Sequence, residues 1–206
     1  RQGYHQEDDI VYPYYGPDYG KMLVTARREK PYKKKACMFI SSDMNRSHRQ
    51  EYLKELMQYT DIDSYGKLYR NCELPVEDRG RDTLLSVIGD YQFVISFENA
   101  IGKDYVTEKF FNPLLAGTVP AYLGAPNIRE FAPGENCFLD ICTFDSPEGV
   151  AAFMNQCYDD EALYERFYAW RKRPLLLSFT KKLEQVRSNP LIRLCQKIHE
   201  LKLGGI

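Results

Sequence analysis

The clearest hydrophobic pattern in the chain lies between residues 93 and 124, where two apolar runs flank an amphipathic segment. Residues 93–97 (FVISF) and 119–123 (VPAYL) are short, apolar and typical of buried strands. Between them, apolar side chains recur at helical spacing, namely Phe110, Phe111, Leu114 and Leu115. The pattern predicts a β-α-β unit with parallel strands and a right-handed crossover.

The ends of this predicted helix carry recognisable capping residues. Thr107 is suited to the N-cap and Gly117 to the C-terminal end. Glu108 and Lys109 fall in the first turn, where backbone N–H groups attract anions, and ligands of β-α-β units bind at the carboxyl ends of the strands. We therefore expect an anion-binding site here, although Glu108 alone is also explained as an acid favoured by the helix dipole.

An earlier segment repeats the arrangement. Residues 36–40 form an apolar run, residues 48–59 carry apolar side chains on one helical face, and residues 62–65 form the next short run. Arg49 falls in the first turn of this helix, as Lys109 does in the other. Consecutive β-α-β units predict an α/β fold with a parallel sheet.

Arg49 and Lys109 are both unfavourable for their own helix dipoles, by about 0.3–1 kcal/mol each. A negative group should compensate them. A diphosphate shared between the two loops is the economical candidate, because Arg binds it bidentately and Lys as a point charge. Taken singly, each cation is more often a solvated surface charge, and Asn99 is explained as an ordinary turn residue.

Composition narrows the function classes. The 206 residues suit one α/β domain with appendages, and 44% hydrophobic residues are enough for a core. A net charge of −1 gives no electrostatic case for nucleic acid. The basic cluster at 33–35 is expected to flank the first strand as solvated charges, with attraction of a nucleotide as the alternative. His5, His48, His199 and the six cysteines lack the spacing of metal ligands.

After residue 144 the pattern becomes helical. Ser146 is suited to the N-cap of a helix with Pro147 at its first position. Residues 160–171 predict a second helix, and Trp170 is expected to pack it against the sheet.

Short motifs follow one another in a fixed order through the best-defined part of the chain. They are FENA at 97–100, DYVTEK at 104–109, LAG at 115–117, VP at 119–120, GAP at 124–126 and FAP at 131–133. Together they resemble the signature of the inverting α1,3/α1,4-fucosyltransferases of glycosyltransferase family 10, which use GDP-fucose. The resemblance extends over residues 9–173 and is closest to the enzymes that fucosylate the core of N-glycans.

The resemblance implies the C-terminal, donor-binding half of a GT-B glycosyltransferase, built on a Rossmann-like, doubly wound parallel sheet. Residues 1–35 would lead in from an N-terminal domain, 36–173 would form the GDP-fucose-binding domain, and 174–206 a helical tail. We expect that N-terminal domain, which carries the general base in this family, to precede the chain. The resemblance also implies a lumenal domain anchored in the Golgi membrane.

Carried over by position, the resemblance assigns a role to each candidate residue. Arg49 and Lys109 would contact the diphosphate, and Asn99 and Tyr105 would line the same pocket. Glu108, the catalytic candidate, would contact the fucose. Cations stabilise the departing GDP and a carboxylate stabilises the oxocarbenium-like sugar, so that neither a metal nor another cofactor is required.

Three functions fit these observations. The first is transfer of fucose from GDP-fucose, with inversion, to an N-acetylglucosamine hydroxyl of a glycan acceptor. The second is a module that binds GDP without turnover because the base-bearing domain is absent. The third is a transferase that shares the architecture and uses another nucleotide sugar.

Residues 45–47 (NRS) form an N-glycosylation sequon within the predicted donor loop. A glycan there would obstruct the donor, so we predict that Asn45 is unmodified in active protein made by a secretory host. Peptide mass spectrometry checks this prediction. A glycan mass on Asn45 in active protein would contradict our placement of the loop.

Overall fold

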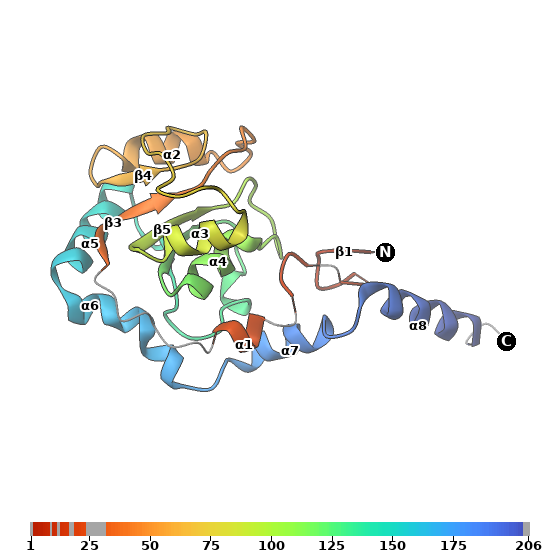
Figure 1. Ribbon diagram of the computed structural model, residues 1–206. Helices are drawn as coiled ribbons and strands as arrows, with labels where there is room; N and C mark the ends of the chain where they lie inside the picture. The colour runs from red at the N-terminus through yellow and green to blue at the C-terminus, as the bar shows by residue number, and fades with distance from the viewer. Residues whose placement is uncertain (1, 9, 12, 17–18, 24–31, 204–206) are drawn as a thin grey trace.

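A parallel sheet of five strands forms the centre of the computed structural model, which describes residues 2–8, 10–11, 13–16, 19–23 and 32–203 (Figure 1). The strands lie in the order β4-β3-β5-β6-β7, and all neighbours are parallel. They are β3 (Lys33–Met38), β4 (Ile62–Ser64), β5 (Tyr91–Phe97), β6 (Val119–Leu123) and β7 (Leu139–Asp140). The chain adds β4 on one side of β3 and the later strands on the other, so the winding reverses between β3 and β5.

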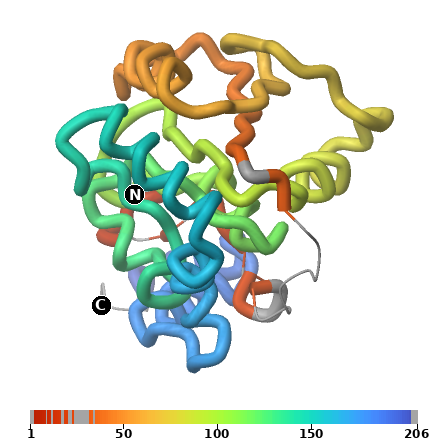
Figure 2. The backbone as a smooth tube through the Cα atoms, turned by 90° about the vertical axis from the view of Figure 1, so that its left-hand side faces the viewer, coloured from red at the N-terminus to blue at the C-terminus, as the bar shows by residue number. Residues whose placement is uncertain are grey.

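Helices cover both faces of the sheet, which confirms the predicted doubly wound α/β fold. On one face, α2 (Arg49–Leu56) packs against α5 (Pro147–Asp159). On the other face, α3 (Arg81–Ile88) packs against α4 (Glu108–Ala116). Figure 2 views the molecule from the side on which α5 lies.

Strand β5 is buried along its whole length, which explains its continuous apolar run. Phe93 and Ile95 face the core formed with α2 and α5, whereas Val94 faces the core formed with α3. A strand at the middle of a doubly wound sheet has no polar face, because helices cover both sides.

Shorter elements surround the sheet. They are β1 (Gln2–Gly3), β2 (Ile10–Val11), α1 (Tyr19–Leu23), η1 (Ile128–Glu130), η2 (Ile141–Thr143), α6 (Glu161–Glu165), η3 (Arg166–Lys172), α7 (Leu177–Gln185) and α8 (Pro190–Leu203). In the predicted lead-in 1–35, residues 1, 9, 12, 17–18 and 24–31 lie outside the described residues. Within the described part of the chain, no helix is long and apolar enough to cross a bilayer.

The predicted caps are confirmed. The Thr107 hydroxyl accepts a hydrogen bond from the backbone N–H of Lys109 at 3.4 Å, and α4 ends at Gly117, whose φ of 79° is left-handed. Ser146 caps α5 in the same way, by accepting from the N–H of Gly149 at 3.2 Å.

Two predicted helices have different bounds. The helix predicted over 48–59 begins only at Arg49, because His48 adopts a left-handed conformation with φ 54°, and it ends at Leu56. The single helix predicted over 160–171 is instead α6 followed by the 3₁₀-helix η3. Trp170, at the end of η3, is buried.

The basic cluster at 33–35 was predicted to flank the first strand, and this was wrong, because β3 begins at Lys33. Lys35 Nζ lies 2.6 Å from Oδ1 of Asp63 on β4. Lys33 Nζ donates to the Tyr91 hydroxyl at 3.1 Å, and that hydroxyl donates to Asp63 Oδ2 at 2.5 Å. Asp63 therefore pairs with Lys35 directly and is linked to Lys33 through Tyr91.

We predict that Asp63→Asn lowers the free energy of unfolding by about 1–3 kcal/mol at pH 7, because Lys35 and Tyr91 lose a charged acceptor. Burial raises the pKa of Asp63, but hydrogen bonds from Lys35 and Tyr91 outweigh it and hold the pKa below its usual value. A carboxyl with a lowered pKa stabilises the fold above its unfolded pKa of about 3.9, and this stability is lost as the pH falls through the folded pKa.

Urea unfolding at several pH values measures this effect. The difference between wild type and Asp63→Asn should shrink as the pH falls below about 4. Asp61→Asn, at an exposed neighbouring position, is the matched control and should be nearly neutral. A destabilisation that is the same at all these pH values would contradict the assignment.

Candidate functional site

The loops that follow β3 and β5 meet at the carboxyl edge of the sheet, because the winding reverses between these strands. Ligands of open α/β sheets bind at such switch points. Residues 39–48 follow β3, and residues 98–107 follow β5. The predicted site residues lie on the second loop or in the first turn of the helix after each loop: Arg49, Asn99, Tyr105, Glu108 and Lys109.

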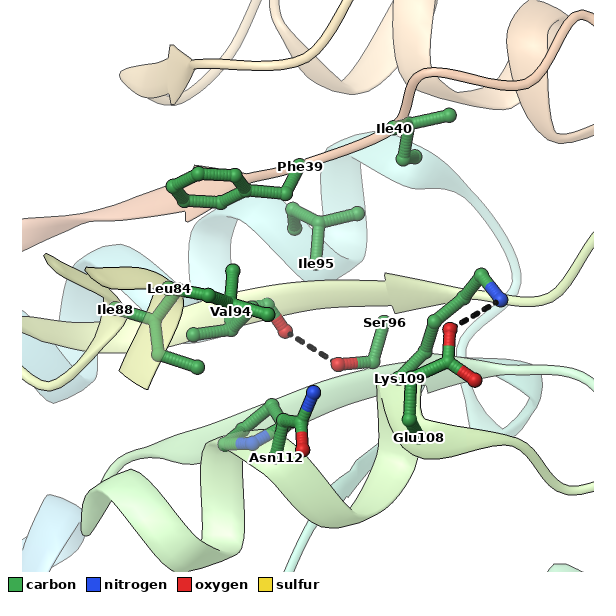
Figure 3. Close-up of a pocket in the computed structure, with 11 residues that line it drawn as sticks. Phe39, Ile40, Leu84, Ile88, Val94, Ile95, Ser96, Glu108, Lys109 and Asn112 are labelled. Carbon is green, nitrogen blue, oxygen red and sulfur yellow. Dashed lines mark hydrogen bonds and ion pairs between the residues drawn. The ribbon is translucent and has the colours of Figure 1, made fainter. Parts of the chain in front are cut away.

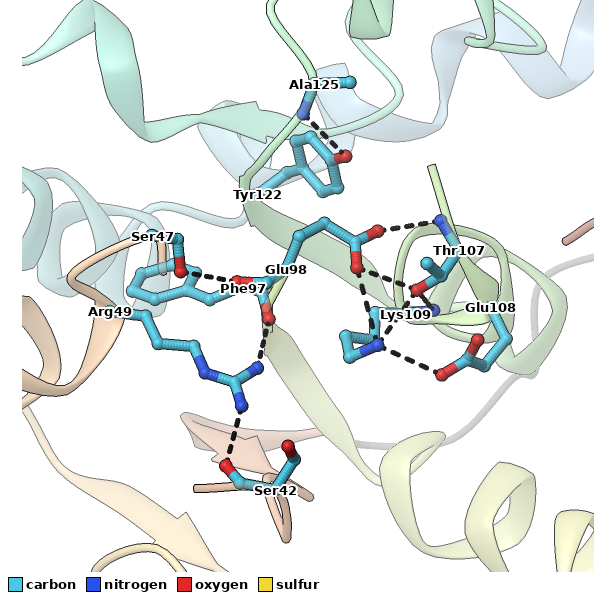
Figure 4. A network of polar contacts seen from close by, with 10 residues as sticks. All are labelled: Ser42, Ser47, Arg49, Phe97, Glu98, Thr107, Glu108, Lys109, Tyr122 and Ala125. Carbon is cyan, nitrogen blue, oxygen red and sulfur yellow. Dashed lines mark hydrogen bonds and ion pairs between the residues drawn. The ribbon is translucent and has the colours of Figure 1, made fainter. Parts of the chain in front are cut away.

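Glu98, the first residue after β5, is the centre of the polar contacts here (Figure 4). Its side chain is fully buried, and Oε1 accepts a hydrogen bond from the Thr107 N–H at 2.7 Å. Oε2 accepts from the Thr107 hydroxyl at 2.8 Å and lies 3.4 Å from Lys109 Nζ. A buried carboxylate thus joins the end of β5 to the start of α4.

The surroundings of Glu98 shift its pKa in opposing directions. Burial raises its pKa above the usual value, whereas Lys109 and the hydrogen bonds from Thr107 act to lower it. The Tyr122 phenol stands nearby on β6, and its pKa is raised strongly by burial and by the charge of Glu98. The Tyr122 oxygen accepts from the Ala125 N–H at 3.1 Å, which keeps this side chain in place.

Lys109 lies between the buried carboxylate and solvent. Its ammonium donates to the Thr107 hydroxyl at 3.0 Å and to Glu108 Oε1 at 3.2 Å. The Lys109 side chain is 25% exposed and that of Glu108 is 51% exposed, whereas the Glu98 side chain is inaccessible. A ligand can therefore reach Lys109 and Glu108 directly.

Arg49 points from α2 towards the same end of β5, but its guanidinium is buried (Figure 4). It donates to the carbonyl of Phe97 at 3.0 Å and to the carbonyl of Ser42 at 2.8 Å, while its Nε has no partner in the described part of the chain. Burial lowers the pKa of Arg49, and Glu98 opposes this change. The carbonyl oxygens of Phe97 and Ser42 thus offset part of the Arg49 charge, which the sequence led us to expect an anion to compensate.

Arg49 and Lys109 reach consecutive residues, the carbonyl of Phe97 and the carboxylate of Glu98. The fold therefore brings the two predicted cations to one strand end. They differ in access, since Lys109 is partly exposed and Arg49 is not. That either one contacts a diphosphate stays a prediction.

Asn99 and Tyr105 lie on the loop between β5 and α4, as predicted. Asn99 Oδ1 is buried and has no hydrogen-bond partner among the described residues. Tyr105 is partly buried, which raises its pKa, and its ring packs edge-on against Tyr4 at 5.4 Å and Tyr14 at 5.6 Å between centroids. Their roles in a donor pocket stay predictions.

A pocket of about 100 Å³ lies beside this network, between β5, α3 and α4 (Figure 3). Most of its wall is apolar, and Glu108 and Lys109 stand at one end. Its lining residues are Phe39, Ile40, Leu84, Ile88, Val94, Ile95, Ser96, Glu108, Lys109, Asn112 and Pro113.

Sequence reasoning missed two residues that hold the site together. Glu98 was noted only as part of the FENA motif, because a glutamate is rarely fully buried unless it is paired. Ser47 was seen only as part of a sequon, yet its buried hydroxyl donates to the Glu98 carbonyl at 2.6 Å. Ser47 and Arg49 together tie the loop after β3 to the end of β5.

Potential metal ligands do not gather in this part of the fold. Within the described ranges, no three side chains of His, Cys, Asp or Glu are grouped so that they could hold a metal ion. All six cysteines are free thiols.

The family model described as glycosyltransferase family 10 (fucosyltransferase) C-term matches residues 29–203. The chain belongs to glycosyltransferase family 10. The match includes both loops of the switch point and all five predicted site residues. It confirms the family that the ordered motifs indicated.

Curated relatives of this family 10 chain carry two kinds of name. The chain is 35% identical over 140 residues to human GDP-fucose protein O-fucosyltransferase 3, which covers 65% of this chain and 29% of the human protein. It is 36% identical over 139 residues to alpha-(1,3)-fucosyltransferase B of Drosophila melanogaster, which covers 63% of this chain and 31% of that protein. The alignments thus span about three tenths of these relatives.

Solved structures share the fold of this family 10 chain. An alpha1,3-fucosyltransferase with GDP-fucose is similar with a TM-score of 0.59 at 17% identity, over 87% of this chain and 55% of that one. An alpha1,3-fucosyltransferase with GDP is similar with a TM-score of 0.60 at 15% identity, over 85% of this chain and 53% of that one. The likeness confirms the expected GT-B type of α/β fold.

We predict that Arg49→Met destabilises the fold by about 1–3 kcal/mol, because the carbonyls of Phe97 and Ser42 lose a charged donor. Thermal or urea unfolding without nucleotide measures this. Arg46→Met, at an exposed position on the loop that precedes α2, is the matched control and should change stability by less than about 0.5 kcal/mol. Equal stability of both variants would show that Arg49 does not hold the loop.

Proposed function

We propose that this chain is the donor-binding part of an enzyme that transfers fucose from GDP-fucose, with inversion, to an N-acetylglucosamine hydroxyl of a glycan. The observation that carries the proposal is Lys109, a partly exposed ammonium held at the switch point of a family 10 chain. Lys109 is the more accessible of the two predicted cations, so an anion can pair with it directly. Among solved structures of the same fold, one is described with GDP-fucose and another with GDP.

The proposed reaction is a single displacement at the anomeric carbon. The acceptor oxygen forms a bond to that carbon, while the bond from the carbon to the β-phosphate oxygen breaks and its electron pair leaves with GDP. Lys109 stabilises the charge that develops on the diphosphate, and the half-exposed Glu108 carboxylate stabilises the oxocarbenium-like sugar. The proton of the acceptor hydroxyl passes to a base, which we place in an N-terminal domain outside this chain.

Two cations contribute to the proposed diphosphate site. Lys109 supplies an accessible charge, and Arg49 adds a fixed charge behind the loops. We therefore propose that GDP-fucose is a substrate and that the reaction needs no separate cofactor. We also propose that the protein acts on the lumenal side of the Golgi membrane.

A second acceptor class has its own support. The human relative at 35% identity is named GDP-fucose protein O-fucosyltransferase 3, and its alignment covers 65% of this chain. The alternative proposal is therefore that the acceptor is a hydroxyl group of a protein. Donor chemistry at Lys109 would be the same in both cases.

Lys109→Ala should weaken GDP binding about 10- to 150-fold, the range expected for loss of one charged hydrogen bond. Isothermal titration of GDP into this chain measures the change. Lys103→Ala is the matched control, because Lys103 lies on the loop that leads into α4 but its exposed ammonium pairs with Glu7 at 2.6 Å. Undiminished GDP affinity in Lys109→Ala would refute the assignment of Lys109 to the diphosphate site. Equal affinity of the wild type for UDP would refute the assignment of GDP as the nucleotide.

Turnover distinguishes the acceptors. In a longer protein that includes the N-terminal domain, we expect fucose transfer to a glycan that ends in N-acetylglucosamine, and a drop of two to three decades in rate for Lys109→Ala. The same assay is run with folded protein acceptors that carry no glycan. Transfer to these alone would replace the glycan acceptor by the alternative.

A further inference from the structure

We infer that Glu98 positions Lys109 for the donor diphosphate, an inference that rests on the proposed function. Glu98 is fully buried, so it touches no substrate and acts through its partners. Its carboxylate holds both the hydroxyl and the N–H of Thr107, and it lies 3.4 Å from Lys109 Nζ. Thr107 in turn accepts from Lys109 Nζ at 3.0 Å.

The Lys109 side chain needs such an anchor. A lysine ammonium sits on a flexible four-carbon stem and is strongly hydrated, so a free lysine at a helix start samples many rotamers. Its other carboxylate contact is Glu108, whose side chain is half exposed and is itself placed beside the proposed sugar position. The buried carboxylate and the capping hydroxyl are therefore the rigid parts of the Lys109 environment.

Because Glu98 carries a negative charge, the direction in which its removal changes GDP affinity tests the inference. The groups that face it are Lys109 and Glu108 on α4, Arg49 on α2, and the phenols of Tyr105 and Tyr122. If Glu98 acted only as a negative charge near the site, its removal would strengthen binding of an anionic nucleotide. If it positions Lys109, its removal weakens binding, although a repulsive charge has gone.

A double-mutant cycle on GDP affinity separates these cases. Glu98→Gln keeps the shape of the side chain and an acceptor for the Thr107 N–H, but removes the charged acceptor for Lys109. We expect about a 10-fold loss of GDP affinity in an otherwise wild-type chain and less than about a 2-fold change when Lys109 is already alanine. Tighter binding, or the same loss in both backgrounds, overturns the inference.

A second pair of variants tests the same network from its other side. Thr107→Val removes the hydroxyl that joins Glu98 to Lys109, whereas Thr107→Ser retains it. Thr107→Val should weaken GDP binding and Thr107→Ser should leave it within about 2-fold of wild type. If the two Thr107 variants bind GDP with equal affinity, the inference is overturned. This test does not require Glu98→Gln to fold.

Side-chain order at Lys109 is a readout that does not need nucleotide. Carbon-13 relaxation of the lysine ε-methylene groups should report an ordered Lys109 in the wild type and a mobile one in Glu98→Gln. If the wild type binds no GDP while Lys109 is ordered by Glu98, the proposed function fails and the positioning role stands. A Lys109 that is equally mobile in both proteins overturns the positioning role.

Discussion

A carboxylate buried at the end of the central strand holds the site together. Glu98 is inaccessible to water, and burial of a charge is costly unless hydrogen bonds and an opposite charge compensate it. Thr107 and Lys109 provide that compensation from the start of α4, while the Glu98 backbone bonds to Ser47 on one side and to Leu123 on the other. One residue thereby joins two loops and the ends of two neighbouring strands.

The topology explains why this point is a candidate site. Where winding reverses, the loops after β3 and β5 depart towards opposite faces, and the carbonyls at the strand end need donors other than a further strand. Ser47 and Arg49 provide them. Lys109 pairs with the buried carboxylate and is also partly exposed to solvent, so that an anion can bind to it.

Local patterns predicted the elements well where helix or strand ends are marked by the chain itself. The apolar run 119–123 and β6 coincide, because Gly117 and Gly124 bound it, and α4 has its predicted cap and end. The helix predicted over 48–59 was too long at both ends, since nothing in the pattern reveals the left-handed backbone of His48 or the turn at 57–59. The basic cluster was misplaced for a related reason, because Asp63, the partner of Lys35, is distant in the sequence.

By itself, the sequence determined the α/β class, the caps of α4, the family resemblance and the presence of a cation in the first turn after each of two strands. These depend on neighbouring residues, which a linear pattern contains. Only the tertiary structure decided that Arg49 is buried against carbonyls, that Lys109 remains accessible, and that Glu98 links the loops. Those outcomes depend on which strands adjoin in the sheet, because strand order determines which side chains face each charge.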